Sequence, residues 1–268
     1  MRLERHEELL LLAHLTGRNR TDVLLMKEMP DDVRRAFFDA CERRHAGEPL
    51  QYILGEWDFY GLTFKTDARA LIPRAETELL VEKVLAFCAG KKAVRILDVC
   101  TGTGCVAITL AKLLKKNDVG VEVIATDISE AALSLARENA ALHDVEAHVQ
   151  FIQGDLASGL LPNDGASGIE IFDVVVSNPP YIPIGELDIL QTEVRDYEPR
   201  LALDGGVDGM DLYRRLLPQA HALLLPNGGL FLEIGPRGVM ALVQYAGFRD
   251  VRIWQDYAGL DRMITATK

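Results

Sequence analysis

Residues 93–105 read AVRILDVCTGTGC, an apolar run that leads into a turn containing two glycines. The run at 93–99 carries several β-branched side chains, and a short apolar segment of this kind predicts a buried strand. Beyond the turn, residues 105–117 carry apolar side chains at the spacing of an amphipathic helix. Gly102 and Gly104 allow the chain to turn tightly between the two elements. A strand followed directly by a helix is the repeating unit of α/β folds.

The same alternation continues along residues 77–268. We expect strands at residues 93–100, 121–127, 148–155, 171–178, 228–235, 250–256 and 261–268. We expect helices at residues 77–89, 105–117, 129–143, 210–224 and 238–246. This order predicts a mostly parallel sheet with helices on both faces. Only YAGL separates the last two strands, which is too short for a crossover helix, so the last strand is expected to be antiparallel.

The N-terminal part of the chain shows a different pattern of apolar residues. Residues 1–55 contain three helical patterns, HEELLLLAHL, TDVLLMKEM and DDVRRAFFDACERRHAG, with apolar residues three or four positions apart. Residues 56–76 then change period, and the alternation in EWDFYGLTF around Tyr60-Gly61 predicts a short hairpin. We therefore expect a small helical domain at 1–55, a hairpin linker at 56–76 and the α/β domain at 77–268.

The composition is that of a soluble globular protein. Of the 268 residues, 49% are hydrophobic and 26% are charged, and the net charge is −11. An acidic chain repels polyphosphate, so direct binding of nucleic acid is not expected. No apolar run approaches the ~20 residues of a membrane span, and the N-terminus lacks signal-peptide features. The cysteines form no CxxC pair and the histidines form no cluster, so we expect a cytoplasmic protein that uses no metal.

Polar residues follow the strands at the edge where α/β folds bind their ligands. The turn 102–107, GTGCVA, fits the GxGxxA pattern of a dinucleotide-binding loop. Asp127 ends the second expected strand, where a carboxylate can accept hydrogen bonds from both hydroxyls of a ribose. Asp155 ends the third, where it can accept from an adenine amino group. Together these features predict an adenosine held across the carboxyl ends of the strands. They do not separate NAD from S-adenosylmethionine.

The fourth strand ends in SNPPYIP, residues 177–183, and this stretch indicates the chemistry. Two prolines in succession make a stiff segment without backbone N–H donors. The segment offers the Asn178 side-chain oxygen and the Pro179 carbonyl as acceptors, with Tyr181 as a flat wall. Two fixed acceptors match a planar NH₂ group, which has two donors. Holding both hydrogens orients the nitrogen toward an electrophile and stabilises the positive charge that builds on it.

Asn-Pro-Pro-Tyr resembles the signature of methyltransferases that act on planar conjugated NH₂ groups. Further stretches narrow this resemblance: PLQYILGEWDFYGLTF (49–64), ALIPRAETELLVE (70–82), LDVCTGTGC (97–105) and YEPRLALDGGVDGMDLYR (197–214). Together they look like the HemK/PrmC family, the release-factor glutamine methyltransferases, nearly from end to end. The resemblance implies a seven-stranded Rossmann-like sheet, S-adenosylmethionine as cofactor and S-adenosylhomocysteine as product. It implies as substrate the glutamine of the Gly-Gly-Gln loop in bacterial class-1 peptide release factors.

The resemblance also implies roles for individual residues. The residues that would hold the methionine part of the cofactor are Cys100, Thr101, Gly102, Thr103 and Gly104. Asp127 would bind the ribose, and Asp155 and Leu156 would border the adenine. Asn178, Pro179, Pro180 and Tyr181 would hold the glutamine, with Asn178 also beside the cofactor. Residues 74–78 would lie over the cofactor, and the N-terminal helices would grip the release factor.

Two positions depart from the family pattern, which usually has glycine at Cys100 and proline at Ala75. Cys100 is expected to pack rather than react, and Ala75 changes no proposed chemistry. One alternative activity is methylation of adenine amino groups in DNA or RNA, which shares the site logic but needs a basic surface. A more remote alternative is an NAD-dependent oxidoreductase, which explains GTGCVA and leaves NPPY unexplained.

Overall fold

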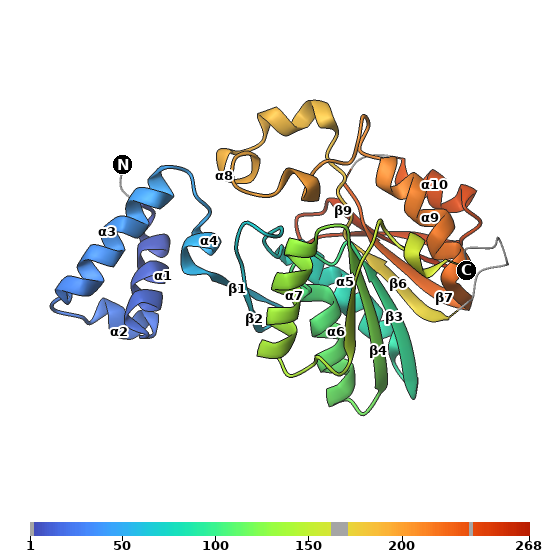
Figure 1. The fold of residues 1–268 in the computed structure, drawn as a ribbon, viewed down its shortest axis with the longest axis horizontal. Helices are drawn as coiled ribbons and strands as arrows, with labels where there is room; N and C mark the ends of the chain where they lie inside the picture. The colour runs from blue at the N-terminus through green and yellow to red at the C-terminus, as the bar shows by residue number, and fades with distance from the viewer. Residues whose placement is uncertain (1–2, 162–170, 236–237) are drawn as a thin grey trace.

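A twisted sheet of seven strands forms the centre of the protein (Figure 1). The computed structural model describes residues 3–161, 171–235 and 238–268. The strands are β3 (Ala93–Val99), β4 (Gly120–Asp127), β5 (Val149–Gln153), β6 (Phe172–Ser177), β7 (Leu224–Glu233), β8 (Arg249–Gln255) and β9 (Asp261–Thr267). Their order in the sheet is β5-β4-β3-β6-β7-β9-β8.

The directions of the strands confirm the predicted fold class. Strands β3 to β7 pair in parallel, whereas β9 is antiparallel to both β7 and β8. The chain leaves β3 toward β4 on one side and later returns to place β6 on the other side. The gap between the ends of β3 and β6 is therefore the switch point of the sheet, where folds of this type bind their ligands.

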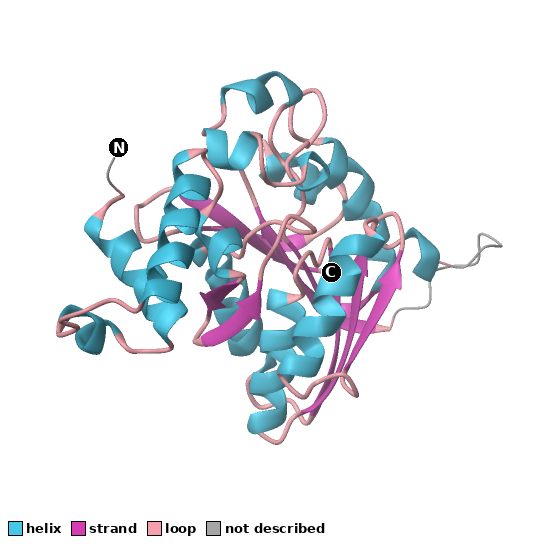
Figure 2. Cartoon of the chain, turned by 60° about the vertical axis from the view of Figure 1, so that its left-hand side comes forward, coloured by secondary structure: helices cyan, strands magenta, loops and turns pink. Residues whose placement is uncertain are grey.

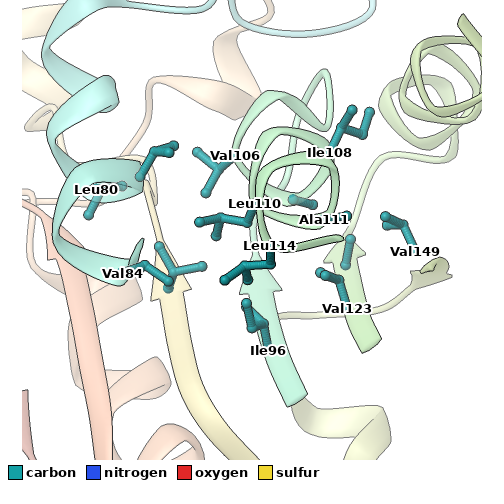
Figure 3. Close-up of a cluster of buried hydrophobic side chains, with 14 of the residues drawn as sticks. Leu80, Val84, Ile96, Val106, Ile108, Leu110, Ala111, Leu114, Val123 and Val149 are labelled. Atoms are coloured by element: carbon teal, nitrogen blue, oxygen red, sulfur yellow. The ribbon is translucent and has the colours of Figure 1, made fainter. Parts of the chain in front are cut away.

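Helices cover both faces of the sheet. One face packs against α5 (Glu78–Cys88), α6 (Cys105–Lys116) and α7 (Glu130–Leu142), and Figure 3 shows the buried Leu80, Val84 and Ile96 there. The other face packs against α9 (Asp211–Leu223) and α10 (Val239–Tyr245). Neighbouring residues of one strand point to opposite cores, as the pleat of a β-strand requires. No helix of the described residues is long and apolar enough to cross a membrane.

Four helices precede the sheet and lie to one side of it in Figure 1: α1 (Arg5–Thr16), α2 (Arg20–Leu24), α3 (Asp31–His45) and α4 (Leu50–Leu54). They share a small core of Leu11, Ala40 and Leu50. The helix expected at 21–29 is present as α2 but is shorter, because α2 ends at Leu24. The predicted hairpin is present as β1 (Glu56–Phe59) and β2 (Leu62–Lys65).

The hairpin is bound to the α/β part through a buried amide. Asn139 on α7 accepts a hydrogen bond from the backbone N–H of Lys65 at 2.8 Å. Its Nδ2 donates to the carbonyl oxygens of Lys65 and Thr103, at 3.2 and 3.0 Å. Phe59 and Phe64 bury their rings in the core on the same side. The hairpin is thus fixed to the helix and to the glycine turn at once.

The sequence did not predict the short helices between β6 and α9. These are η3 (Ile184–Ile189), α8 (Thr192–Arg195) and η4 (Arg200–Ala202). This segment reaches the N-terminal helices, where Glu193 pairs with Arg44 at 2.9 Å and Tyr197 donates to the Ala46 carbonyl at 3.0 Å. In Figure 2, helices and loops of the chain cover the upper edge of the strands. The carboxyl ends of the parallel strands are therefore enclosed by segments from several parts of the sequence.

Candidate active site

A cavity of about 300 Å³ lies at the carboxyl ends of β3, β4 and β6. Every residue predicted to bind the cofactor lines this cavity except Gly104: Cys100, Thr101, Gly102, Thr103, Asp127, Asp155, Leu156 and Asn178. Residues 69–74 and Thr77 form another wall, and residues of the segment 199–204 complete the enclosure. The structure therefore brings the ends of four predicted strands, β3 to β6, together around one space.

The two glycines of the turn have different functions. Both have positive φ, 56° at Gly102 and 79° at Gly104, a conformation that side chains disfavour. A Cβ at Gly104 would lie 2.8 Å from Cδ1 of Ile108, so this glycine permits close packing of the turn against the helices. A Cβ at Gly102 would meet no atom within 4 Å, and Gly102 lines the cavity. Gly102 is thus the glycine whose backbone is open to the cavity.

Cys100 adopts the backbone conformation of a glycine. Its φ is 61°, in the left-handed region, which explains physically why glycine suits this position. Burial raises the pKa of its thiol far above the ordinary value, and the carboxylates of Asp127 and Asp98 raise it further. The thiol therefore stays protonated, and it packs beside the apolar core on the α9 side of the sheet. This agrees with a packing function rather than a reactive one.

Asp127 connects β4 to the glycine turn. Its Oδ2 accepts from the backbone N–H of Gly102 and its Oδ1 accepts from that of Ser129, both at 2.9 Å. Burial raises the pKa of this carboxyl, while the backbone hydrogen bonds oppose the increase. Each carboxylate oxygen can accept a second hydrogen bond, so the group can still bind hydroxyls in the cavity.

Asp98 was not among the predicted cofactor residues, although it is the penultimate residue of β3 and lines the same cavity. It is 2% exposed, and its Oδ2 accepts from the Thr101 hydroxyl at 2.6 Å. Burial raises its pKa to about 7. Its place in the sequence, immediately before the glycine turn, was the signal that could have identified it.

Asp155 and Leu156 follow β5 at the edge of the cavity. The Asp155 carboxylate forms an ion pair with Arg215 of α9, and both residues line the cavity. The side chain of Leu156 is buried and its φ is 55°. The carboxylate is therefore held at the cavity by a cation that the sequence prediction did not include.

A second, smaller cavity of about 110 Å³ adjoins the first. Asn178 and Pro180 line both cavities, whereas Pro179 and Tyr181 line only the smaller one. Ser177 fixes the start of this segment, because its hydroxyl donates to the Val99 carbonyl of β3 at 2.6 Å. The predicted NH₂-binding residues thus lie together, with Asn178 on the wall between two spaces.

Thr77, within the loop 74–78 expected over the cofactor, and Glu233, which was not among the predicted site residues, complete this part of the site. Nδ2 of Asn178 donates to the Thr77 hydroxyl at 3.2 Å, and that hydroxyl donates to Oε2 of Glu233 at 2.6 Å. The Tyr181 hydroxyl donates to the other oxygen of Glu233 at 3.3 Å. Glu233 is 3% exposed, and burial raises its pKa to about 7. Asn178 and Tyr181 are therefore connected to one buried carboxyl group.

The loop expected over the cofactor is attached to the segment after NPPY. Arg74 pairs with Glu198, which is 5% exposed and also accepts from the Ile72 backbone N–H at 3.1 Å. Arg74 lines both cavities. Ala75 is exposed at the start of η1 (Ala75–Thr77), away from the cavity lining.

Comparison with known proteins identifies the family. Residues 3–55 match the PrmC N-terminal domain, and residues 90–232 match a methyltransferase domain. A release factor glutamine methyltransferase from Chlorobaculum tepidum is 42% identical over 94% of this chain and 86% of its own. Its counterpart from Deinococcus radiodurans is 41% identical over 97% of this chain and 89% of its own. The chain belongs to the release factor glutamine methyltransferase family.

Solved structures support the fold of this family member. A methyltransferase from Pyrococcus furiosus aligns with a TM-score of 0.50 and 18% identity, covering 78% of this chain and 90% of its own. An S-adenosylmethionine-dependent methyltransferase from Agrobacterium tumefaciens aligns with a TM-score of 0.53 and 17% identity, covering 80% of this chain and 69% of its own. At these identities the likeness establishes the fold alone. The sequence prediction of a methyltransferase fold and family is confirmed.

Proposed function

We propose that this protein transfers a methyl group from S-adenosylmethionine to the side-chain amide nitrogen of the glutamine in the Gly-Gly-Gln loop of class-1 peptide release factors. The observation that carries the proposal is the position of Asn178 between the two cavities. Its Nδ2 is used by Thr77, and the described residues donate no hydrogen bond to its Oδ1. An acceptor thus remains for a substrate amide at the boundary with the cofactor space.

The larger cavity suits an adenosyl cofactor. The backbone of Gly102 is open to the cavity, the carboxylate of Asp127 can accept from ribose hydroxyls, and Asp155 borders the place assigned to the adenine. Its volume of about 300 Å³ is within the range of small-molecule sites. When bound, S-adenosylmethionine supplies a methyl group on a positively charged sulfur. The pair Arg74–Glu198 holds the loop that closes this space from above.

The smaller cavity would receive the glutamine side chain. Oδ1 of Asn178 and the Pro179 carbonyl accept the two amide hydrogens, and the ring of Tyr181 forms a wall. Holding both hydrogens directs the nitrogen lone pair toward the larger cavity. The same acceptors stabilise the positive charge that develops on nitrogen. As the bond from nitrogen to the methyl carbon would form, the bond from that carbon to sulfur would break, the sulfur would be left as a neutral thioether, and one amide proton would be lost to the solvent. The ring of Tyr181 packs directly against Gly235, where a Cβ would lie 2.2 Å from its Cδ2, so only glycine leaves room for the ring.

The proposal places the protein in the cytoplasm and gives the N-terminal helices the task of binding the release factor. They expose Leu25 and Phe38, at 74% and 59% of their surfaces. They also contact the segment that follows NPPY, through Arg44 and Glu193. Val194, next to Glu193 in the same segment, lines the smaller cavity, so a partner bound to these helices would lie near that cavity.

The test is to incubate the protein with labelled S-adenosylmethionine and a purified class-1 release factor, and to locate the label by peptide mapping. We expect label on the glutamine of the Gly-Gly-Gln loop and none on a factor in which that glutamine is alanine. Asn178→Ala should transfer the label about 10²–10³ times more slowly, the usual cost of losing a positioned hydrogen-bonding group. Parallel reactions with DNA and RNA test the alternative activity. Label on nucleic acid, with none on the factor, would refute the proposal.

A further inference from the structure

Thr77 lies at the meeting point of three elements. It is the last residue of η1, immediately before α5, and it is 3% exposed. Its hydroxyl lies 3.2 Å from Nδ2 of Asn178, at the end of β6, and 2.6 Å from Oε2 of Glu233, at the end of β7. Thr77 also lines the larger cavity. The hydroxyl is thus buried between the carboxyl group and the amide that faces the substrate space.

A hydroxyl has one hydrogen to donate, and its direction is determined by the stronger acceptor. Once Glu233 is ionised, its carboxylate accepts and cannot donate, so the hydrogen of Thr77 is then committed to Glu233. The oxygen of Thr77 then has only lone pairs to offer Asn178. It can pair with the NH₂ side of the Asn178 amide and not with the oxygen side.

We propose that Thr77 is a positioning residue that fixes the orientation of the Asn178 amide so that its oxygen faces the glutamine NH₂ group. The inference rests on the proposed function, because it concerns how the same site selects its substrate group. Without the hydroxyl, nothing in the network distinguishes the two orientations of the amide. In the reversed orientation the NH₂ group of Asn178 would face the NH₂ group of the substrate, donor against donor.

The expected effect is on transfer rather than on cofactor binding. Removing the hydroxyl leaves the Asn178 NH₂ group without its partner and permits the reversed orientation. Leaving a buried polar group unpaired corresponds to a factor of roughly 5 to 150. We therefore expect Thr77→Val, which keeps the shape of the side chain, to lower the single-turnover rate by a factor in this range. Thr77→Ser restores the hydroxyl and should retain most of the rate.

The experiment measures single-turnover methylation of a release factor by the full-length protein at saturating cofactor, at about pH 8.5, where Glu233 is ionised. S-adenosylhomocysteine affinity, measured by calorimetry, should change little in Thr77→Val. The decisive comparison is a double-mutant cycle with Asn178→Ala. In that background Thr77→Val should have no further effect on the rate, because the amide that it positions is absent. A purely structural function of Thr77 would instead give additive losses.

The possible results separate this inference from the proposed function. A wild-type protein that fails to methylate the release factor refutes the proposed function. The assignment of Thr77 is overturned if the wild-type protein is active and Thr77→Val transfers the methyl group at the wild-type rate. It is also overturned if the losses in the double-mutant cycle are additive. Where Thr77→Val does not fold, Thr77→Ala takes its place, since it removes the hydroxyl without placing a methyl group against Glu233.

Discussion

Glu233 should make the stability of the protein depend on pH, and Glu233→Gln should remove that dependence. The carboxyl group is 3% exposed, and burial raises its pKa from an ordinary 4.5 to about 7. Hydrogen bonds from Thr77 and Tyr181 and the charge of Arg262 oppose this increase, and the charge of Glu76 adds to it. Below pH 4.5 the group is neutral in the folded and the unfolded chain, so the free energies of unfolding of the wild type and the variant differ by an amount that does not depend on pH.

The magnitude follows from the two pKa values. Because the folded pKa is raised, the stability that Glu233 contributes is complete below pH 4.5 and is lost as pH rises through about 7. Each pKa unit corresponds to about 1.4 kcal/mol, so the loss between pH 4.5 and pH 8 is about 3 kcal/mol. The Gln side chain does not ionise and should show no such loss. Asp98, whose pKa is also about 7, is present in both proteins and cancels in the difference.

The assay is urea denaturation of both proteins at a series of pH values from 4.5 to 8.5. The measured quantity is the free energy of unfolding of Glu233→Gln minus that of the wild type. We expect this difference to increase by about 3 kcal/mol over the series, with most of the change below pH 7.5. A difference that stays constant with pH would show that burial beside Thr77 and Tyr181 does not raise the pKa of Glu233, and would refute the prediction.

Three further predictions concern the cofactor loop and the partner. Asp127→Ala should weaken S-adenosylmethionine binding by about 1.5–3 kcal/mol, the range for hydrogen bonds to charged groups, and unchanged calorimetric affinity would contradict the ribose assignment. Cys100→Gly should leave the affinity for S-adenosylmethionine nearly unchanged. Its free energy of unfolding in urea should stay within about 1 kcal/mol of the wild-type value, because glycine adopts the left-handed φ without strain but has more conformational freedom in the unfolded chain. Leu25→Glu combined with Phe38→Glu should raise the KM for the release factor without changing the affinity for S-adenosylhomocysteine. Leu260→Glu, at a similarly exposed position outside these helices, is the control. An equal KM in the double variant and the control would show that the helices are not the docking element.

Most of the sheet could be predicted because its strands are determined by local patterns. The apolar runs at 93–99 and 172–177 are bounded by turns, and both are strands in the structure. The antiparallel last strand followed from the shortness of residues 257–260. The start of β7 was predicted four residues too late, because Pro226 and Asn227 look like a turn. In the structure Leu224 already pairs with Phe172, and the register shifts before Gly229 pairs with Val174.

The segment 183–202 could not be predicted in the same way. Its short helices have no apolar periodicity long enough to recognise, and their conformation depends on contacts with distant parts of the chain. Glu198 is a clear example, since its buried carboxylate accepts from Ile72 and pairs with Arg74. In a sequence, a glutamate of this kind looks like an exposed charge. Only the fold supplies the partners that permit its burial.

The candidate site separates in the same manner into a predictable part and an unpredictable part. Asp127, Gly102 and Asn178 stand at strand ends or in a turn, and the topology of parallel sheets alone predicts that such residues meet. The network behind Asn178 follows instead from the order of the strands. Because β6 lies beside β7 and α5 packs against both, the ends of the three elements meet at Thr77, although 156 residues separate Thr77 from Glu233. In the proposed function the NPPY motif therefore specifies which groups face the substrate, whereas we infer that the orientation of its asparagine depends on two residues outside the motif, Thr77 and Glu233.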